Sequence, residues 1–572
     1  MSKLIYIFIL LSFNTVGICD STEDKRKNYM KNLYGMNKEI TGDYDKSLSI
    51  TCNNGIFVGI KVNDVLSFKG IPFAKPPINE LRWKDPILAE DSDKVYEAYY
   101  FGKSPIQREI KNQLGGFYPK SEDCLYLNIW LNTKDTSTNK PVMVFIHGGG
   151  YYSGATSDPL YDGNNLISKY SDIIFVSIGY RLDFLGFIDF STVSGGENYK
   201  SSINLGLLDQ ICALKWIQKN IKNFGGDPEK VTLFGNSAGG ASISLLILMD
   251  ESKGLFKRII DESGPLSITS SKEESKKLAS LLLQKYNAKN MEDLLSIPEE
   301  KLYDIITNDL NSNYPQRDGN ILPSDLYGAY KKGKGKDIDM LIGSNQNETM
   351  FFYLMHGDIK FKIGFQVLYE NDVKNMNHED KKRAEEFMKL LNNKRIWKIA
   401  EFYNDVIFRL PLLKQAEYHS DNGGNTYVYY WKYSGEIQPY GAYHSIELPY
   451  VFNNFNNTAF ENGLKENTDI INNIQEMWVN FARNGNPSTD KYVWDKYDSK
   501  SRKTMIIDKK IEMIEDYNGK QREILDPLLK YYLKGSISNL SYNVPIVYKL
   551  VGQILVVLLA AFGLIYLLKK LF

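Results

Sequence analysis

The stretch Val231-Thr232-Leu233-Phe234-Gly235-Asn236-Ser237-Ala238-Gly239-Gly240 decides the fold. Its first four residues form a β-branched and apolar run, typical of a strand covered on both faces. The residues that follow, from Ala238 to Met249, have the composition of a helix. The Gly-x-Ser-x-Gly motif therefore lies at a sharp turn from strand to helix, where glycines on either side leave room for the serine hydroxyl to stand above the sheet. The alternative is an ordinary glycine-rich turn with a capping serine.

Similar uninterrupted runs predict further buried strands, and helical stretches lie between them. The strands are expected at Val142–Ile146, Ile173–Ile178 and Met340–Ile342, and the helices at Gly206–Ile221, Lys272–Tyr286 and Ile470–Asn484. This alternation predicts a mostly parallel α/β sheet with helices on both faces. No internal repeat, low-complexity tract or long linker interrupts the chain between Asn28 and Tyr532, so one large domain is expected.

A second glycine run, His147-Gly148-Gly149-Gly150, directly follows the strand predicted at Val142–Ile146. Successive glycines let backbone N–H groups approach a ligand closely. We expect the N–H groups of Gly149 and Gly150, together with that of Ala238, to bind the oxyanion formed when an ester carbonyl is attacked. His147 is expected to be structural.

These motifs resemble those of the type-B carboxylesterase and cholinesterase family, and the likeness extends from about Gly55 to Tyr497. It also rests on several other blocks in the same order: Phe68–Ala74, Leu81–Trp83, Ser121–Asn128, Gly206–Gln210, Phe224–Pro228, Glu262–Gly264, and Trp478 with Asn480–Arg483. The resemblance implies an α/β-hydrolase fold and a serine esterase that cleaves small carboxylic esters. It also implies structural ion pairs between Arg82 and Glu122 and between Arg181 and Asp209.

The same resemblance identifies the other catalytic residues. The block Ile342–Glu348 is similar to the one that carries the acid, which falls on Glu348, and the block Gly441–Tyr450 to the one that carries the base, which falls on His444. With Ser237, the chain order of nucleophile, acid and base is that of α/β-hydrolases. The nucleophile is activated by its neighbouring base, so neither a metal nor an organic cofactor is expected.

The chain also departs from the family pattern. Most relatives have a glutamate before the serine, where this chain has Asn236, and cholinesterases carry a choline-binding tryptophan where this chain has Leu114 and Gly115. Both differences favour neutral esters over choline esters. The family's loop disulfide lacks a partner for Cys124 in the stretch 102–107, and whether Cys52 replaces that partner is left open. Cys212 lies on the apolar face of a predicted helix and is expected to be a buried thiol.

Composition and the two ends suggest where the protein works. Lys plus Arg and Asp plus Glu both total 69, which gives no electrostatic reason to expect nucleic acid as a partner. Residues 1–19 have the pattern of a secretory signal cut after Cys19. Leu550–Leu568 is long and apolar enough for a transmembrane helix, and Lys569 and Lys570 follow it.

These features predict a single-pass type I membrane protein of the secretory pathway, with its catalytic domain lumenal or extracellular. The expected division is a signal peptide at 1–19, the catalytic domain at 20–531, a polar stalk at 532–549, the transmembrane helix at 550–568 and a cytosolic tail at 569–572. The tail resembles a dilysine signal for retrieval to the endoplasmic reticulum, and a GPI anchor is the alternative. Glycosylation is expected at Asn456 and Asn539 rather than at Asn347.

The motifs leave two other functions open. A non-catalytic adhesion ectodomain of the same fold would suit a membrane anchor, but adhesion does not require all of Ser237, Glu348 and His444 together with an oxyanion loop. A choline esterase is the second alternative. Acyl and alcohol specificity and oligomeric state have no readable signal in the sequence.

Overall fold

The computed structural model describes residues 33–107, 118–308, 314–356, 358–435, 440–455 and 464–533. The predicted signal peptide, the transmembrane helix, the cytosolic tail and most of the stalk, from residue 534, lie outside the described residues. Within the described ranges, no helix has both the length and the apolar character needed to cross a bilayer.

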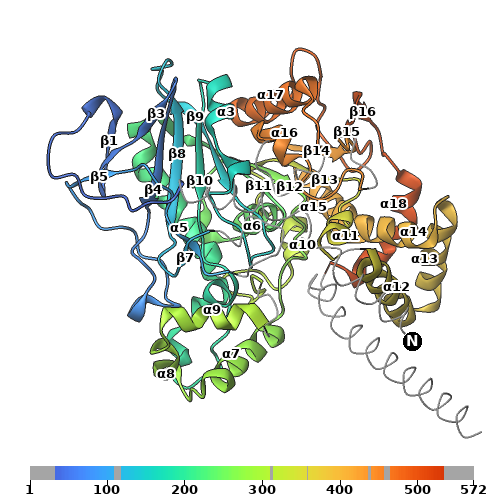
Figure 1. The fold of residues 1–572 in the computed structure, drawn as a ribbon. Coiled ribbons are helices and arrows are strands. Elements are labelled where there is room, and N and C mark those ends of the chain that lie inside the picture. Colours follow the sequence, from blue (N-terminus) through green and yellow to red (C-terminus); the bar gives the residue numbers. More distant parts are fainter. Residues whose placement is uncertain are drawn as a thin grey trace, which may run out of the picture.

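An 11-stranded sheet runs through the middle of the molecule (Figure 1). Its order is β16-β15-β14-β13-β12-β11-β9-β10-β8-β4-β3. Neighbouring strands from β15 to β10 are parallel, and the pairs at the two ends of the sheet are antiparallel. The strands are β3 (Ile60–Val62), β4 (Val65–Pro72), β8 (Tyr126–Asn132), β9 (Lys140–Ile146), β10 (Ile174–Ile178), β11 (Gly226–Asn236), β12 (Arg258–Glu262), β13 (Asp339–Asn345), β14 (Thr426–Trp431), β15 (Thr504–Ile507) and β16 (Ile511–Ile514).

The elements predicted from the sequence are present with small shifts at their ends. The four predicted strands are β9, β10, β11 and β13. The four predicted helices are α5 (Leu205–Asn220), α6 (Ala238–Leu246), α7 (Lys272–Tyr286) and α17 (Thr468–Asn484). α6 ends at Leu246, three residues before the expected end at Met249. The predicted α/β-hydrolase class, mostly parallel with helices on both faces, is confirmed.

Alternate residues of the central strands belong to two separate apolar layers, which explains why these strands read as uninterrupted hydrophobic runs. On one face, Phe145 and Phe234 pack in the same cluster as Trp478 of α17. On the other face, Val144 and Leu233 pack in the same cluster as Leu214 of α5. The sheet is therefore buried on both sides, and its strand ends are where polar side chains can meet.

Smaller elements surround this core. β1 (Ser49–Cys52), β2 (Gly55–Val58) and β5 (Val95–Glu97) make a three-stranded sheet, and β6 (Ser104–Pro105) pairs with β7 (Lys120–Ser121). In Figure 1, α12, α13, α14 and α18 group at one end of the molecule, and α7, α8 and α9 group below the sheet. The remaining helices are α3 (Asn164–Lys169), α4 (Asp183–Gly186), α8 (Met291–Leu295), α9 (Glu299–Asn308), α10 (Leu326–Lys331), α11 (Met350–His356), α12 (Asp358–Asn375), α13 (His378–Leu390), α14 (Arg395–Tyr403), α15 (Leu410–Asp421), α16 (Leu448–Phe452) and α18 (Gly519–Leu525), with the short 3₁₀ helix η10 (Asp526–Tyr531).

Two ion pairs expected from the family resemblance are present and buried. Arg82 Nε lies 2.6 Å from Glu122 Oε1, and Arg181 Nη2 lies 2.7 Å from Asp209 Oδ1. Both arginines make two bonds to their carboxylates, which fixes the geometry of the segments that they join.

The three cysteines of the described residues are buried and free. Cys52 therefore does not replace the missing partner of Cys124 in this structure. Cys212 lies in α5 as a buried thiol, as predicted.

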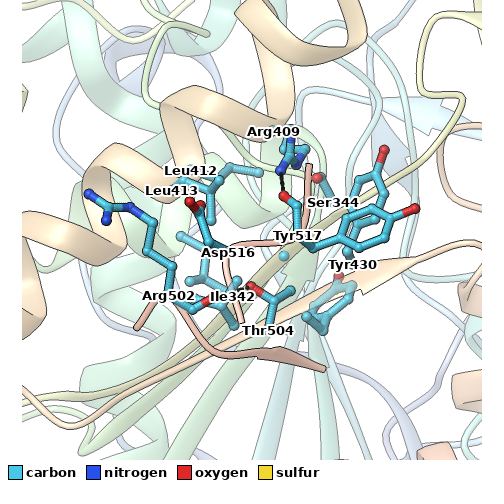
Figure 2. Close-up of a pocket in the computed structure, with 13 residues that line it drawn as sticks. Ile342, Ser344, Arg409, Leu412, Leu413, Tyr430, Arg502, Thr504, Asp516 and Tyr517 are labelled. Atoms are coloured by element: carbon cyan, nitrogen blue, oxygen red, sulfur yellow. Dashed lines mark hydrogen bonds between the residues drawn. The ribbon is translucent and has the colours of Figure 1, made fainter. Parts of the chain in front are cut away.

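A cavity between β13, β14, β15 and α15 does not contain the predicted site (Figure 2). Ile342, Leu412 and Val428 line its apolar side, and Arg409 and Asp516 contribute charged groups. The volume of this cavity is about 20 Å³, which is enough for roughly one water molecule and far smaller than a ligand pocket. None of Ser237, Glu348 and His444 lines it, so it is not the substrate site.

Candidate active site

Ser237 lies between the end of β11 and the first residue of α6. Its backbone has φ 58° and ψ −122°, a conformation that costs energy for any residue with a side chain. The turn is held by its neighbours: the Ser237 N–H donates to Glu262 O at 2.8 Å, and the Ala241 N–H donates to Ser237 O at 2.8 Å. The predicted strained turn from strand to helix is thus present at the predicted serine.

The flanking glycines are needed because the turn packs against β9. A Cβ on Gly239 would lie 1.9 Å from the carbonyl oxygen of Ile146, and one on Gly235 would lie 2.7 Å from the same oxygen. No side chain fits at either position without moving backbone. The motif therefore brings the serine turn against the end of β9, where the second glycine run begins.

The predicted oxyanion loop lies against this turn. A Cβ on Gly148 would approach the Asn236 carbonyl oxygen to 2.7 Å and the Ser237 Cβ to 3.2 Å. Gly149 and Gly150 have φ of 103° and 61°, values that favour glycine. Among the described residues, the N–H groups of Gly149 and Gly150 meet no acceptor. Ala238 is the first residue of α6, so its N–H also lacks an acceptor within the helix.

His147 anchors this loop. Its ring stacks on Tyr180 at 4.6 Å between centroids, and its Nδ1 lies 2.8 Å from Gly148 O. Burial lowers the pKa of His147 to about 4, so the imidazole is neutral near pH 7. These contacts agree with the structural role predicted for it.

Glu348 and His444 meet although 96 residues separate them in the chain. His444 Nδ1 lies 2.6 Å from Glu348 Oε2, and both side chains are buried. The other carboxylate oxygen of Glu348 accepts from the Asn345 N–H at 2.7 Å and from Ser263 Oγ at 2.6 Å. Because both of its oxygens are bonded, Glu348 can accept a hydrogen bond from the Nδ1–H group in only one orientation of the imidazole.

Charge and packing define the environment of His444. Burial acts to lower the pKa of His444, but the charge of Glu348, its hydrogen bond to the ring and the charge of Glu447 together raise the pKa above its ordinary value of 6.5. Two aromatic rings flank the imidazole, Phe351 at 5.6 Å and Phe408 at 5.3 Å between centroids. The imidazole of His444 is therefore paired with a carboxylate and confined between two aromatic rings.

The neighbours of Ser237 and His444 are bonded to each other. Ser445 Oγ donates to Asn236 Oδ1 at 2.6 Å, which joins the serine turn to the histidine loop. Between the Ser237 hydroxyl and the His444 ring, both of them within the described ranges, no hydrogen bond is formed. Catalytic hydrogen bonds are often long before substrate binds.

Sequence reasoning did not identify the buried acid that supports this link. Glu447 accepts from Asn236 Nδ2 at 2.7 Å and from Asn345 Nδ2 at 2.5 Å. Burial, reinforced by the charge of Glu348, raises the pKa of Glu447 from 4.5 to about 7. The available signal was its position three residues after His444 in the family block. Glu447 thus joins the segments that carry the predicted nucleophile, acid and base.

Across the described ranges, no group of three or more His, Cys, Asp or Glu side chains could hold a metal ion. The polar groups gathered at these strand ends suit acyl transfer from an ester, with a strained serine, a histidine paired with an acid, and free N–H groups beside them.

Comparison with known proteins identifies the family. The model of the carboxylesterase family matches residues 46–525. The chain belongs to the carboxylesterase family. Among its relatives, the para-nitrobenzyl esterase of Bacillus subtilis is 34% identical over 509 residues, covering 84% of this chain and 98% of that protein. Liver carboxylesterase B-1 of Rattus norvegicus is 32% identical, covering 77% and 86%. An acetylcholinesterase of Leptinotarsa decemlineata is 30% identical, covering 76% and 77%.

Solved structures agree with this assignment. A para-nitrobenzyl esterase structure superposes with a TM-score of 0.72 at 33% identity, and a Geobacillus stearothermophilus carboxylesterase with 0.74 at 30%. Each alignment covers 83% of this chain and 99% of the other. Membership confirms the predicted activity, carboxylic ester hydrolysis, and does not favour the adhesion alternative.

Proposed function

We propose that this carboxylesterase cleaves neutral carboxylic esters through an acyl-enzyme on Ser237, with His444 as general base and Glu348 as its partner. The observation that carries the proposal is the 2.6 Å contact between His444 and Glu348, beside a serine held at φ 58°. A buried imidazole whose Nδ1–H is bonded to a carboxylate keeps Nε2 unprotonated and ready to accept a proton.

The chemistry proceeds in two halves. Ser237 Oγ attacks the carbonyl carbon while its proton passes to His444 Nε2, and the imidazolium is stabilised by Glu348. The bond to the alcohol then breaks as His444 returns that proton to the leaving oxygen. In the second half, a water molecule gives a proton to His444 and attacks the acyl carbon. The bond from the acyl carbon to Ser237 Oγ then breaks as His444 returns the proton to Oγ, which frees the acid and restores Ser237.

The oxyanion of each tetrahedral intermediate would be bound by the N–H groups of Gly149, Gly150 and Ala238. Their freedom from other acceptors in the described chain, and the contact of the glycine loop with the serine turn, support this role. One donor of this kind contributes about 2.7–4 kcal/mol in the transition state. No cofactor is required for any of these steps.

Neutral esters are proposed over choline esters because of Asn236. A neutral amide occupies the position next to the nucleophile, and its polar atoms are engaged by Ser445 and Glu447. A cationic substrate therefore gains no electrostatic attraction from this position. The second argument from the sequence, the missing tryptophan near Leu114, falls in residues 108–117, outside the described residues.

We also propose that the catalytic domain is displayed on the lumenal or outer side of a membrane, anchored by residues 550–568. The support is the sequence pattern of residues 1–19 and 550–568. Retrieval to the endoplasmic reticulum through Lys569 and Lys570, and glycosylation of Asn456 and Asn539, belong to the same proposal. Asn347 is a poor site for glycosylation because its side-chain oxygen already accepts a hydrogen bond from the Ala442 N–H at 3.0 Å.

Covalent labelling tests the enzyme. Purified protein is treated with a fluorophosphonate and assayed with p-nitrophenyl acetate, beside Ser237→Ala and a matched control, Ser137→Ala, whose serine is exposed. Wild type and Ser137→Ala should be labelled and active, whereas Ser237→Ala should show neither property. Labelling of Ser237→Ala, or of no variant, would refute the proposed nucleophile.

Rates on acetylthiocholine and on phenyl thioacetate, which share an acyl group, then compare cationic and neutral substrates.

A further inference from the structure

One long helical run is interrupted close to the proposed site. α14 ends at Tyr403, a π-helical segment η9 spans Asn404–Arg409, and α15 begins at Leu410. Pro411 explains the interruption, because proline has no N–H and its ring clashes with the carbonyl four residues earlier, which here belongs to Ile407. A wider turn before the proline relieves that clash. Such turns are rare in helices and occur often at functional sites.

The first residue of η9 is bonded on both sides of the proposed catalytic acid. Asn404 Oδ1 accepts from the Thr349 N–H and from Thr349 Oγ1, both at 2.8 Å. Asn404 Nδ2 donates to Gln346 O at 3.0 Å. Glu348 lies between Gln346 and Thr349 in the chain, so a single amide spans the short loop that carries it.

This loop is buried, and the amide is one of its polar partners, beside the bonds of the Gln346 and Asn347 N–H groups to Trp431 O and Ala442 O. Thr349 and Glu348 are fully buried, and Asn404 is 4% exposed. Water is therefore a poor substitute for the lost bonds, and removing the amide leaves the Thr349 N–H and the Gln346 carbonyl in need of new partners. We expect the loop to shift toward new partners, and Glu348 to shift with it.

The same segment also contacts the base. Phe408 lies four residues after Asn404, and its ring packs on His444 at 5.3 Å between centroids. At its end, η9 is tied down by Arg409, which bonds to Asp405 Oδ1 at 3.2 Å and donates to the Tyr517 carbonyl (Figure 2). η9 therefore contacts the base directly and the acid through the residues on either side of it, and Arg409 holds its end to the segment after β16.

We propose that Asn404 is a positioning residue that holds the Gln346–Thr349 loop so that the Glu348 carboxylate meets His444 Nδ1. This role rests on the ester hydrolase function proposed above, because it acts only through the pair that serves Ser237. Asn404 touches no reacting atom. Its loss should lower kcat, since the imidazole would be less well oriented, and leave KM nearly unchanged, since ester binding does not involve it.

The central experiment is a double-mutant cycle on the full chain. Wild type, Asn404→Ala, Glu348→Gln and the double variant are assayed with p-nitrophenyl acetate, with active sites counted by fluorophosphonate labelling. Asn404→Ala should reduce kcat by about 10- to 100-fold, the cost of roughly 1 Å of misplacement. In the Glu348→Gln background the same change should cost less than about threefold, because the group it positions is already gone.

Asn220→Ala is the matched control for a merely structural loss. Asn220 is also a buried asparagine at a helix end: it accepts from the distant Asn53 N–H at 2.8 Å and donates to Trp216 O of its own helix at 3.0 Å. It lies at the end of α5, shortly before the start of β11, whereas Ser237 follows the end of β11. We expect this variant to lower Tm while its kcat per labelled site stays at the wild-type value.

A second pair of variants keeps the proposal testable if Asn404→Ala does not fold. Thr349→Val removes one of the two bonds to Asn404 Oδ1, whereas Thr349→Ser keeps the hydroxyl. We expect a fall in kcat for valine and a rate close to wild type for serine. An unchanged kcat in folded Asn404→Ala, or an equal loss in both backgrounds of the cycle, overturns the positioning role. If instead the wild type is neither labelled nor active, the hydrolase proposal itself has failed.

Discussion

At the scale of single residues, the proposed site depends on side chains whose partners come from distant parts of the chain. The sequence identified Ser237, Glu348 and His444, because family blocks surround each of them. It did not predict that Asn236 would bond to Ser445 and Glu447, since local patterns carry no record of contacts across 209 and 211 positions. Asn404 was missed for the same reason: its neighbours in sequence resemble an ordinary buried helix.

The pH dependence of the reaction should follow the pairing of His444 with Glu348. His444 works as a base only when neutral, so kcat/KM rises with pH through its pKa. In the wild type, Glu348 holds that pKa above 6.5 although burial opposes it. In Glu348→Gln the burial remains and the carboxylate is lost. We therefore expect the acidic limb to move below pH 6.5 and kcat to fall by about 10⁴-fold.

The measurement is a pH–rate profile of both proteins with p-nitrophenyl acetate, and Glu251→Gln, an exposed acid, serves as the control. A limb that stays in place in Glu348→Gln would contradict the assignment. The acidic limb would then report the titration of another buried group. Glu447, whose pKa burial raises to about 7, is the first candidate.

At the scale of elements, prediction succeeded where the pattern was long and periodic. α17 is expected from Ile470 and begins at Thr468, and α7 has its expected bounds. The sequence was less informative where tertiary packing determines the backbone conformation. α6 stops before Met249, and η9 departs from the α-helical pitch over only six residues, too few for the sequence period to reveal. The turn at Ser237 was predicted well because steric exclusion, which glycine spacing records, determines it.

The serine turn should therefore be intolerant of one added methyl group. In Gly239→Ala the new Cβ would lie 1.9 Å from Ile146 O, a backbone atom that cannot rotate away. β9 and α6 would have to separate, so we expect a loss of stability of about 3 kcal/mol and loss of esterase activity. Gly42→Ala is the matched control, because its Cβ would meet nothing within 4 Å.

Thermal unfolding and fluorophosphonate labelling measure the two effects. Gly42→Ala should behave like wild type in both. A Gly239→Ala protein with an unchanged Tm and full labelling would mean that the close contact between α6 and β9 does not exist in solution.

At the scale of the whole molecule, the alternation of strands and helices was enough to predict the doubly covered sheet, but it did not predict which residues near the C-terminal boundary of the catalytic domain belong to the core. The expected boundary at residue 531 stays a prediction, because residues 534–572 lie outside the described ranges. The last elements, α18 and η10, are not a surface appendage. Ile524, Leu525, Leu528 and Leu529 are at most 5% exposed and belong to the same apolar layer as Trp478.

Truncation at two positions separates the folded body from the proposed anchor. A chain that ends after Leu533 keeps all four of these core residues, so it should fold, remain in the aqueous phase of a detergent partition, and hydrolyse p-nitrophenyl acetate with the kcat/KM of the full chain. A chain that ends after Asn518 loses them. Each such side chain is worth about 2–5 kcal/mol, and together they match the total stability of a typical protein, about 5–15 kcal/mol. That chain should be insoluble or unfolded.

The full chain, with apolar residues 550–568, should enter the detergent phase. If it partitions into water like the shorter active chain, the proposed membrane anchor is wrong, while the activity of the body, measured in the same samples, stands independently.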